Sequence, residues 1–433
     1  YPMSSGILVT HATESEFLDL MHNYLCICTL TLRNVVSVFD NDFYISLSKC
    51  EYAKEPYDYH RTNHSLVYDP LPLIVSNGRI VQADELKITL TSIDFRVIEK
   101  LYNFQIVNVA NLYYYHAHYL PKQIIETILD LYQNKTELKG VEGQEELYMM
   151  SKAMLNSIYG MTVTDILRNE YLYDSERSEW LPPNIVSHQD QTLKENKIER
   201  ENTKSSRFIF YLWGCFVTAY ARANLWSGIV ECGNDYIYSD TDSIKILNSH
   251  RHQDYIQSYN STIISKINTC LTYYNIDPER SRPKGKQMGI WDFDGHYNVF
   301  KTLGAKRYIY LDNSDELHIT IAGLSKTSGR DYILQLAREK CLSAHLPFTP
   351  YHTSYSDSIM SVFTNTLHIP AGHTGKMTHT YIDTPINLPV TDYLGNTYTI
   401  SEPSSIHLED VEYSLSLSQE FLEFLNHFML SQT

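Results

Sequence analysis

The pattern of apolar and polar positions predicts a strand-rich first part, a helical middle and a strand-rich end. Between residues 4 and 90, short runs of β-branched and aromatic residues alternate with polar turns, which is typical of strands. A helical pattern follows from Ser92 to Leu101, with Ser92 as its predicted N-cap. The predicted strands are Tyr24 to Leu32, Val36 to Leu47, Leu73 to Val75 and Leu86 to Leu90.

Two stronger helices are predicted in the middle of the chain. Pro121 opens the first helix and Gly140 closes it, in the positions that proline and glycine favour. The second helix runs from Glu145 to Gly160, and the short GVEG connection predicts a helical hairpin. Residues 161–206 are polar and charged and contain two prolines, so they are predicted to form an inserted loop or arm.

The apolar run 208–230 is long enough to cross a bilayer. It contains Arg222 and Asn224, however, and a charge at the middle of a membrane span is costly. We therefore predict a buried helix, with Arg222 bound to a specific partner. The segment 235–247, DYIYSDTDSIKIL, then predicts a strand, a turn and a strand, and residues 311–433 are β-rich with a closing helix near 417–430.

Composition limits the class of protein. The 433 residues are 43% hydrophobic, which excludes a fully disordered chain and suggests about two to four domains. The formal net charge of −16 argues against a general nucleic-acid binder. The seven cysteines are scattered without a C-x-x-C pair, which argues against a zinc cage or a disulfide framework and favours the cytoplasm.

Asp240 and Asp242 carry the strongest chemical signal. They lie two residues apart between two short apolar strands, so both carboxylates are expected at the tip of a hairpin. Such a pair suits Mg²⁺, and two Mg²⁺ ions can activate a 3′-hydroxyl and stabilise a leaving pyrophosphate. Ordinary turn chemistry also favours Asp and Ser, and a glycosyltransferase could hold a nucleotide-sugar through Mn²⁺ with the same D-x-D.

One face of the second predicted helix suits a nucleoside triphosphate. Lys152, Asn156 and Tyr159 are spaced to project together, and Lys135 on the preceding helix could flank the same triphosphate. A lysine meets phosphate charge and a tyrosine packs against a base pair. The plain alternative is an amphipathic helix with an exposed lysine.

Taken together, four motifs resemble those of family B DNA polymerases, most closely the small protein-primed type of phages and plasmids. KAMLNSIYG (152–160) and YSDTDS (238–243) resemble the second and third polymerase motifs. GAKRY (304–308) resembles the K-x-Y element that holds the primer, and Tyr1-Pro2 resembles the end of the first motif, D-x-x-S-L-Y-P.

The resemblance implies an α+β right-hand polymerase core: a palm with an antiparallel sheet, helical-hairpin fingers and a β-rich thumb. It implies template-directed transfer of nucleotides from dNTPs to a 3′-hydroxyl in viral or plasmid DNA replication. The expected regions are the end of the first motif (1–3), a first insertion with palm elements resembling a terminal-protein region (4–110), fingers (116–160), a second insertion (161–206), palm (207–310) and thumb (311–433).

The resemblance also implies a role for each matching residue. Asp242 and Asp240 would be the catalytic, metal-binding carboxylates for two Mg²⁺ ions. Lys135, Lys152, Asn156 and Tyr159 would form the nucleotide site, with Tyr1 as the residue that excludes a 2′-hydroxyl. Lys306 and Tyr308 would hold the primer. The implied partners are a DNA primer-template and dNTPs; a terminal protein primer is left open, and the protein is expected to be a cytoplasmic monomer that does not bind membranes.

The first motif departs from the family pattern. Its aspartate should precede Tyr1, so the chain is expected to be a polymerase truncated at its N-terminus that does not extend primers alone. A catalytically dead, DNA-binding remnant therefore remains an alternative. Asp40 and Asp42 lack a following Y-P and are predicted to form a turn instead.

Charge is concentrated in two segments beside these motifs. Residues 280–310 hold seven cations against two aspartates, and residues 191–210 hold five cations against three glutamates. Both are predicted to contact template or duplex DNA, although the second could be a solvated arm. His116 and His118 are predicted to lie on a half-exposed strand face rather than to bind metal, and WDFDGH (291–296) to serve in packing.

Overall fold

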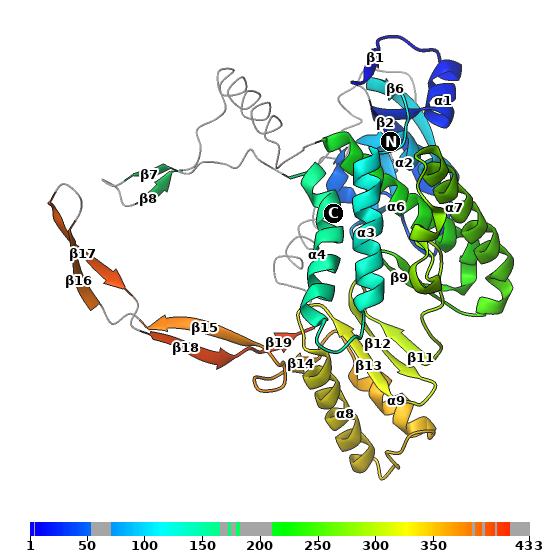
Figure 1. The fold of residues 1–433 in the computed structure, drawn as a ribbon. Coiled ribbons are helices and arrows are strands. Elements are labelled where there is room, and N and C mark those ends of the chain that lie inside the picture. Colours follow the sequence, from blue (N-terminus) through cyan, green and yellow to red (C-terminus); the bar gives the residue numbers. More distant parts are fainter. Residues whose placement is uncertain are drawn as a thin grey trace, which may run out of the picture. The chain divides into compact units, whose positions relative to one another are not determined.

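The computed structural model describes residues 1–3, 5–52, 71–164, 172–174, 179–181, 210–382, 386–391, 395–402 and 405–415. The chain forms two compact units, Tyr1–Trp291 and Asp292–Thr433 (Figure 1). The division falls inside the WDFDGH segment. The palm, fingers and thumb boundaries remain predictions.

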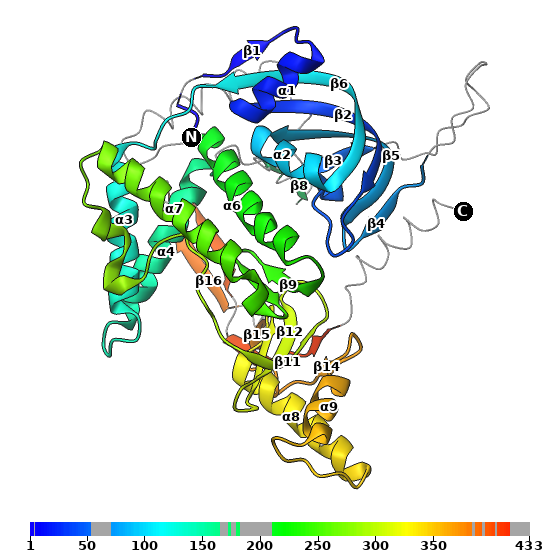
Figure 2. The same ribbon diagram turned by 90° about the vertical axis from the view of Figure 1, so that its right-hand side faces the viewer.

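A curved antiparallel sheet of six strands forms the first part of unit one, and it partly encloses the helix α2 (Figure 2). The strand order is β1-β6-β2-β5-β3, and β4 pairs with β5. Cross-strand pairs such as Arg33 with Glu85, 2.7 Å apart, help to fix the register. The strands are β1 Ile7–Val9, β2 Leu25–Ser37, β3 Cys50–Tyr52, β4 Ile74–Ser76, β5 Arg79–Thr91 and β6 Tyr102–Tyr115.

The predicted strand Val36 to Leu47 is wrong, whereas strands are present at the other three predicted places. β2 continues only to Ser37, and bends follow it instead of a strand. The Ser37 hydroxyl donates to the Phe39 carbonyl at 2.8 Å, and the Asp40-Asn41-Asp42 run favours a turn. The strand β6 was not predicted as a whole.

The helices α1 (Glu14–Asn23) and α2 (Ser92–Leu101) both begin with a capping box. The predicted N-cap Ser92 is wrong, because Thr91 caps α2. The Thr91 hydroxyl oxygen accepts from the Asp94 N–H at 3.2 Å, while the Ser92 hydroxyl donates to the Tyr24 carbonyl at 2.9 Å. Ser92 is therefore used to attach α2 to the sheet.

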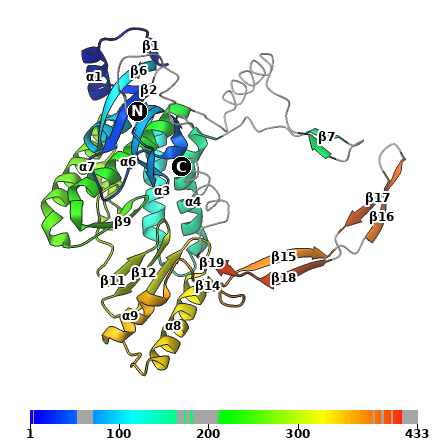
Figure 3. The ribbon, with the colours of Figure 1, turned by 180° about the vertical axis from the view of Figure 1, so that it is seen from behind.

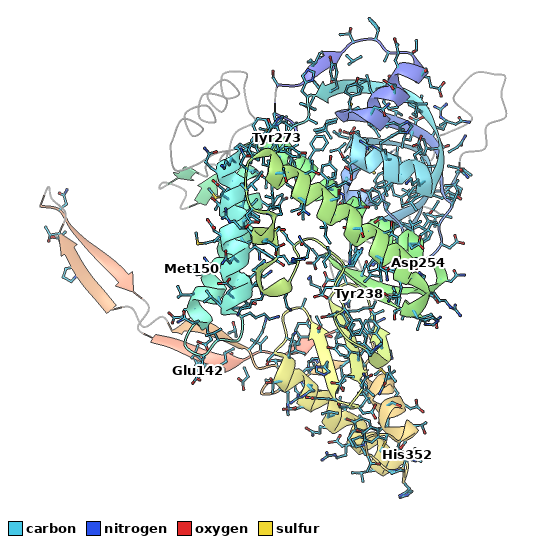
Figure 4. All side chains as sticks on the ribbon, turned by 45° about the vertical axis from the view of Figure 1, so that its right-hand side comes forward. Glu142, Met150, Tyr238, Asp254, Tyr273 and His352 are labelled. Carbon is cyan, nitrogen blue, oxygen red and sulfur yellow. The ribbon has the colours of Figure 1, made fainter. Side chains whose placement is uncertain are left out.

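The predicted helical hairpin is confirmed, as α3 (Lys122–Leu138) and α4 (Glu145–Thr162). Figure 4 labels Glu142 in their connection and Met150 on α4. Leu129 of α3 packs against Leu271 and Ile276, at and beyond the end of α7 (Gln253–Tyr273). The sequence did not predict α7, whose many Ser, Thr and Asn residues are weak helix formers.

The apolar run forms α6, Tyr211–Cys232, as predicted for a helix with a buried face. Its buried side chains include Phe216, Trp226 and Ile229, and Arg222 is bound to Asp94. Among the described residues, no helix has the length and apolar character that a membrane crossing requires. After a short 3-10 helix, α6 leads into the hairpin of β9 (Tyr236–Asp240) and β10 (Ser243–Ile246).

Five short 3-10 helices complete the described elements of unit one: Leu47–Lys49, Gly233–Asp235, Ser249–His252, Pro278–Ser281 and Pro283–Gly285. Of the predicted arm 161–206, the structure describes the last residues of α4 with Val163 and Thr164, and the strand pair β7 (Leu172–Asp174) and β8 (Glu179–Leu181). The cations of the stretch 191–210 lie outside the described residues.

Unit two contains the three-stranded sheet β11-β12-β13 and two helices, α8 and α9, that lie side by side (Figure 3). Its core joins Ile309, Ile319 and Ile321 of the sheet to Ile333 and Ile359 of the helices. Strands were predicted here but these two helices were not, and the predicted closing helix 417–430 lies outside the described residues. The elements are β11 Tyr297–Thr302, β12 Arg307–Asp312, β13 Leu317–Ile321, α8 Lys326–Ser343, α9 Thr353–Val362, β14 His368–Ile369, β15 Met377–Ile382, β16 Ile386–Thr391, β17 Thr397–Glu402, β18 Ser405–Asp410 and β19 Tyr413–Ser414.

Candidate active site

The turn between β9 and β10 displays the two predicted carboxylates together. Asp240 ends β9 and pairs with Ser243, so Thr241 and Asp242 form the turn. The Asp242 N–H donates to the Asp240 carbonyl at 2.6 Å. Thr241 has φ +56°, a left-handed conformation that is strained for a β-branched residue. Strain of this kind is found preferentially at functional sites.

The two carboxylates differ in their surroundings. Asp242 is exposed, and its carboxylate has no hydrogen-bond partner within the described part of the chain. Asp240 is half-buried and its Oδ1 accepts from the Thr241 hydroxyl at 3.0 Å. Mg²⁺ commonly takes one or two protein carboxylates and completes its shell with water and substrate phosphates. The donor set at this tip therefore fits Mg²⁺.

A second acidic cluster does not offer such open ligands. Asp312, Glu316 and His318 form the one group of three or more close metal-ligating side chains among the described residues. There Asp312 accepts from the backbone N–H groups of Ser314 and Glu316 and from the His318 ring at 2.8 Å, while Glu316 binds Arg330. These contacts explain the cluster as a stabilised hairpin turn.

The base of the β9–β10 hairpin is anchored by Asp235, a residue that sequence reasoning missed. Its carboxylate binds the Asn248 amide at 2.9 Å and the His252 ring at 3.1 Å. The Leu247 N–H donates to the Asp235 carbonyl at 2.8 Å. Hydrogen bonds from Asn248 and His252 lower the pKa of Asp235. Figure 4 labels Tyr238 in β9 and Asp254 at the start of α7, just beyond this anchor.

The segment around Asp42 docks against the start of β9. The Tyr236 hydroxyl donates to the Asp42 carboxylate at 3.1 Å and lies 3.0 Å from the Ser239 hydroxyl. The Asn41 amide donates to the Gly233 carbonyl at 2.6 Å. Burial raises the pKa of Tyr236 to about 12, so this hydroxyl stays protonated. In place of the predicted turn, the structure has bends at Asp40 and Asn41. The contact of this segment with β9 was not predicted.

Lys152, Asn156 and Tyr159 are exposed on one face of α4. The Tyr159 ring also lies next to Gly214 of α6, so the first turn of α6 sets its position. Because α6 leads through a short 3-10 helix into β9, it connects this face of α4 with the carboxylate hairpin.

Lys135 lies near the end of α3, with its Nζ 5.9 Å from the centre of the Tyr132 ring. Lys139 follows the last residue of the helix and is exposed. That Lys135 and Lys152 bind the same triphosphate remains a prediction.

Tyr1 is held against α6. Its ring meets the Tyr220 ring edge-on at 6.0 Å, and burial raises the pKa of its hydroxyl. The His118 N–H donates to the Tyr1 carbonyl at 2.9 Å, and the Trp213 indole donates to the Pro2 carbonyl at 2.8 Å. The His118 side chain is exposed, and its ring packs edge-on against the Tyr273 ring at 5.2 Å.

Lys306 and Tyr308 belong to unit two. Lys306 lies in the turn before β12, with φ +53°, and is exposed. The Tyr308 ring stacks on the Phe300 ring at 5.3 Å across β11 and β12. The structure therefore gives Tyr308 a fixed orientation on the sheet face.

Most cations of the 280–310 stretch bind protein groups. In unit one, Arg280 pairs with Asp130 at 2.5 Å, and Lys284 donates to the Glu137 carbonyl at the end of α3. Arg282 pairs with Glu279. In unit two, Lys301 and Arg307 donate to backbone carbonyls, those of Met360 and Leu415. Arg280 and Lys284 therefore fasten the chain to α3, and the predicted DNA contact of this stretch rests on fewer cations than the sequence suggested.

No family model and no curated protein matches the chain. Solved structures do resemble it. The chain is similar to phi29 DNA polymerase complexed with primer-template DNA and incoming nucleotide substrates, with 14% identity and a TM-score of 0.48, over 96% of this chain and 54% of that chain. The same polymerase complexed with single-stranded DNA gives 14% identity and a TM-score of 0.47 over the same shares. The chain thus spans about half the length of these polymerase chains.

Proposed function

We propose that the chain is the core of a family B DNA-directed DNA polymerase, similar to the protein-primed type. The reaction is template-directed addition of a deoxynucleoside monophosphate to a 3′-hydroxyl with release of pyrophosphate. The observation that carries the proposal is the β9–β10 turn, which presents Asp240 and an exposed Asp242 whose carboxylate has no partner among the described residues. The same helix packs against α4, whose exposed face carries Lys152, Asn156 and Tyr159.

Asp242 and Asp240 would hold Mg²⁺, which when bound favours ionisation of the 3′-hydroxyl and neutralises charge on the triphosphate. Lys152 and Lys135 bind the triphosphate through charge-assisted hydrogen bonds. Tyr159 packs against the new base pair, and Asn156 supports that helix face.

Two further contacts select the sugar and hold the primer. The Tyr1 ring, which packs edge-on against the Tyr220 ring, would exclude a 2′-hydroxyl. Lys306 and Tyr308 hold the primer strand near its 3′ end. A protein hydroxyl as the first acceptor is part of the same proposal, because the insertions resemble those of protein-primed polymerases.

The test is templated incorporation of labelled dNTPs with Mg²⁺ by a polypeptide in which a segment with the first-motif aspartate precedes residues 1–433. The Asp242→Asn variant should lower incorporation at least about a thousandfold, because several kcal/mol of transition-state stabilisation are lost. Asp254→Asn is the matched control, since Asp254 is another exposed aspartate of the same unit. It should retain wild-type activity.

The outcomes separate the alternatives. Incorporation that follows the template and requires Asp242 supports a polymerase. DNA binding without incorporation indicates a catalytically dead protein and contradicts the proposal. Transfer of a sugar from a nucleotide-sugar with Mn²⁺ indicates a glycosyltransferase and also contradicts it.

A further inference from the structure

The β9–β10 hairpin, which carries Asp240 and Asp242, depends on support from outside itself. Among the described residues it pairs with no third strand, and an isolated two-stranded hairpin is only marginally stable in water. Asp235 anchors its base, and Ile244 of β10 packs into the space that Gly228 leaves on α6, where a Cβ would lie 2.6 Å from Ile244 Cδ1. Both contacts are made by residues outside β9, the strand that ends at Asp240.

A β-bulge in β9 turns Tyr236 toward the side of Ser239. Consecutive residues of β10 pair with Tyr236 and with Tyr238, which Figure 4 labels, so Ile237 between them is an extra residue opposite β10. Side chains alternate between the two faces of a regular strand, so residues three apart would lie on opposite faces. The extra residue shifts this alternation by one, and the hydroxyls of Tyr236 and Ser239 lie 3.0 Å apart.

Hydrogen bonds join Ser239, Tyr236 and Asp42 in one direction. The Tyr236 hydroxyl gives its single proton to Asp42 Oδ2 at 3.1 Å. Toward Ser239 it is therefore the acceptor, and the Ser239 hydroxyl is the donor. Ser239 directly precedes Asp240. The Asp42 carboxylate thus orients a chain of hydrogen bonds that ends one residue from a predicted metal ligand.

Asp42 is itself held in place by the chain on either side of it. Its Oδ1 accepts from the next N–H along the chain at 2.8 Å. The Asn41 amide donates to the Gly233 carbonyl at 2.6 Å, and the Tyr44 ring meets the Trp226 ring of α6 edge-on at 5.4 Å. The Asp42 carboxylate is therefore an acceptor of fixed position.

We propose that Asp42 and Tyr236 are positioning residues that hold Asp240 in the orientation needed to bind a divalent cation. The inference rests on the proposed function, in which Asp240 and Asp242 hold Mg²⁺. Hydrogen bonds around the ligands of a metal site fix their orientation and raise the affinity for the metal. Both carboxylate oxygens of Asp42 are used within the fold, so Asp42 acts through Tyr236 and Ser239 and is not a ligand itself.

The first measurement is Mn²⁺ binding, followed by electron paramagnetic resonance, on a polypeptide in which a segment with the first-motif aspartate precedes residues 1–433. Tyr236→Phe and Asp42→Ala should each weaken the Mn²⁺ site about tenfold, the lower end of the loss for contacts around metal ligands. Asp42→Asn keeps an oxygen that can accept from Tyr236, so it should stay within about threefold of the wild type. Asp40→Ala is the matched control, because Asp40 is an exposed carboxylate of the same segment, and it should bind Mn²⁺ like the wild type.

A double variant tests whether Asp42 acts through Tyr236. Asp42→Ala combined with Tyr236→Phe should lose no more Mn²⁺ affinity than either change alone, because both break the same hydrogen bond. In the incorporation assay, Tyr236→Phe should raise the Mg²⁺ concentration for half-maximal rate about tenfold and leave the maximal rate nearly unchanged. A folding defect would instead lower the maximal rate.

Failure of the proposed function and failure of this inference give different results. Mn²⁺ binding that requires Asp242 and is weakened by Tyr236→Phe, without any templated incorporation, contradicts a polymerase and supports the positioning role. That role is overturned if Asp42→Asn loses as much Mn²⁺ affinity as Asp42→Ala, if the two losses add in the double variant, or if Asp40→Ala has the same effect. It is also overturned if Asp242→Asn leaves Mn²⁺ binding unchanged, because the hairpin then holds no cation.

Discussion

Asp242 and Asp94 show two opposite uses of a carboxylate in the same compact unit. Asp242 lies in an exposed turn and its carboxylate has no partner among the described residues. Asp94 is buried and accepts from five donor groups. A carboxylate with all its lone pairs engaged cannot ligate a cation without breaking those bonds, whereas an open one can. The difference separates a residue that maintains the fold from one that is available for chemistry.

The largest expected effect is on activity at the turn. Asp242→Asn should reduce templated incorporation by at least about a thousandfold. It should change the free energy of unfolding by no more than about 0.5 kcal/mol, because the side chain is exposed and unpaired. Urea unfolding beside the incorporation assay checks both. A large loss of stability would show that Asp242 also maintains the fold.

Asp94→Ala should instead act mainly on stability. We expect it to lower the free energy of unfolding by about 3 kcal/mol, because the partly buried Arg222 and the Tyr44 hydroxyl lose their acceptor. Asp254→Ala is the control and should stay near the wild type. Urea unfolding measures the change, and an effect as small as that of the control would contradict the comparison.

Substitutions at two glycines test whether α6 packs closely against α4. A Cβ at Gly214 would clash with Val163 and Thr162, so Gly214→Ala should cost about 2 kcal/mol of unfolding free energy and displace Tyr159. Gly160, in the last turn of α4, has open space around it, and Gly160→Ala should instead stabilise by about 0.5 kcal/mol. Thermal unfolding compares the two. Equal effects would rule out close α4–α6 packing at Gly214.

The smallest expected effect is a pH dependence at the base of the hairpin. The pKa of Asp235 is lowered in the folded chain by Asn248 and His252, so the unfolded state binds a proton more readily. Its contribution to stability is present above the unfolded pKa and is lost as the pH falls through the folded pKa. Urea unfolding from neutral to acidic pH should therefore show a shallower loss for Asp235→Asn than for the wild type. Parallel curves would contradict this account.

The sequence predicted local elements well where a strong pattern or a breaker residue was present. Pro121 and Gly140 marked the first helix of the hairpin, and the apolar residues around Asp240 and Asp242 indicated two strands. The predicted role of a side chain was wrong where that side chain binds a distant segment of the chain. Ser92 looked like a cap, but it binds Tyr24, 68 residues away.

The sequence also could not show which charged side chains bind other parts of the protein. Arg280 and Lys284 read as candidate DNA contacts, but the fold uses them to attach the chain to α3. Local spacing reports which residues share a helix face or a turn, and it contains no information on which of two distant charges will meet.

By itself, the sequence determined that Asp240 and Asp242 share a turn and that Lys152, Asn156 and Tyr159 share a helix face. Both follow from the fixed periodicity of strands and helices. Only the tertiary structure decided that Arg222 is neutralised by Asp94 and that Asp235 anchors the hairpin. These contacts depend on how separate elements pack, since burial and partners, rather than residue type, set whether a charge stabilises the fold or remains available to a ligand.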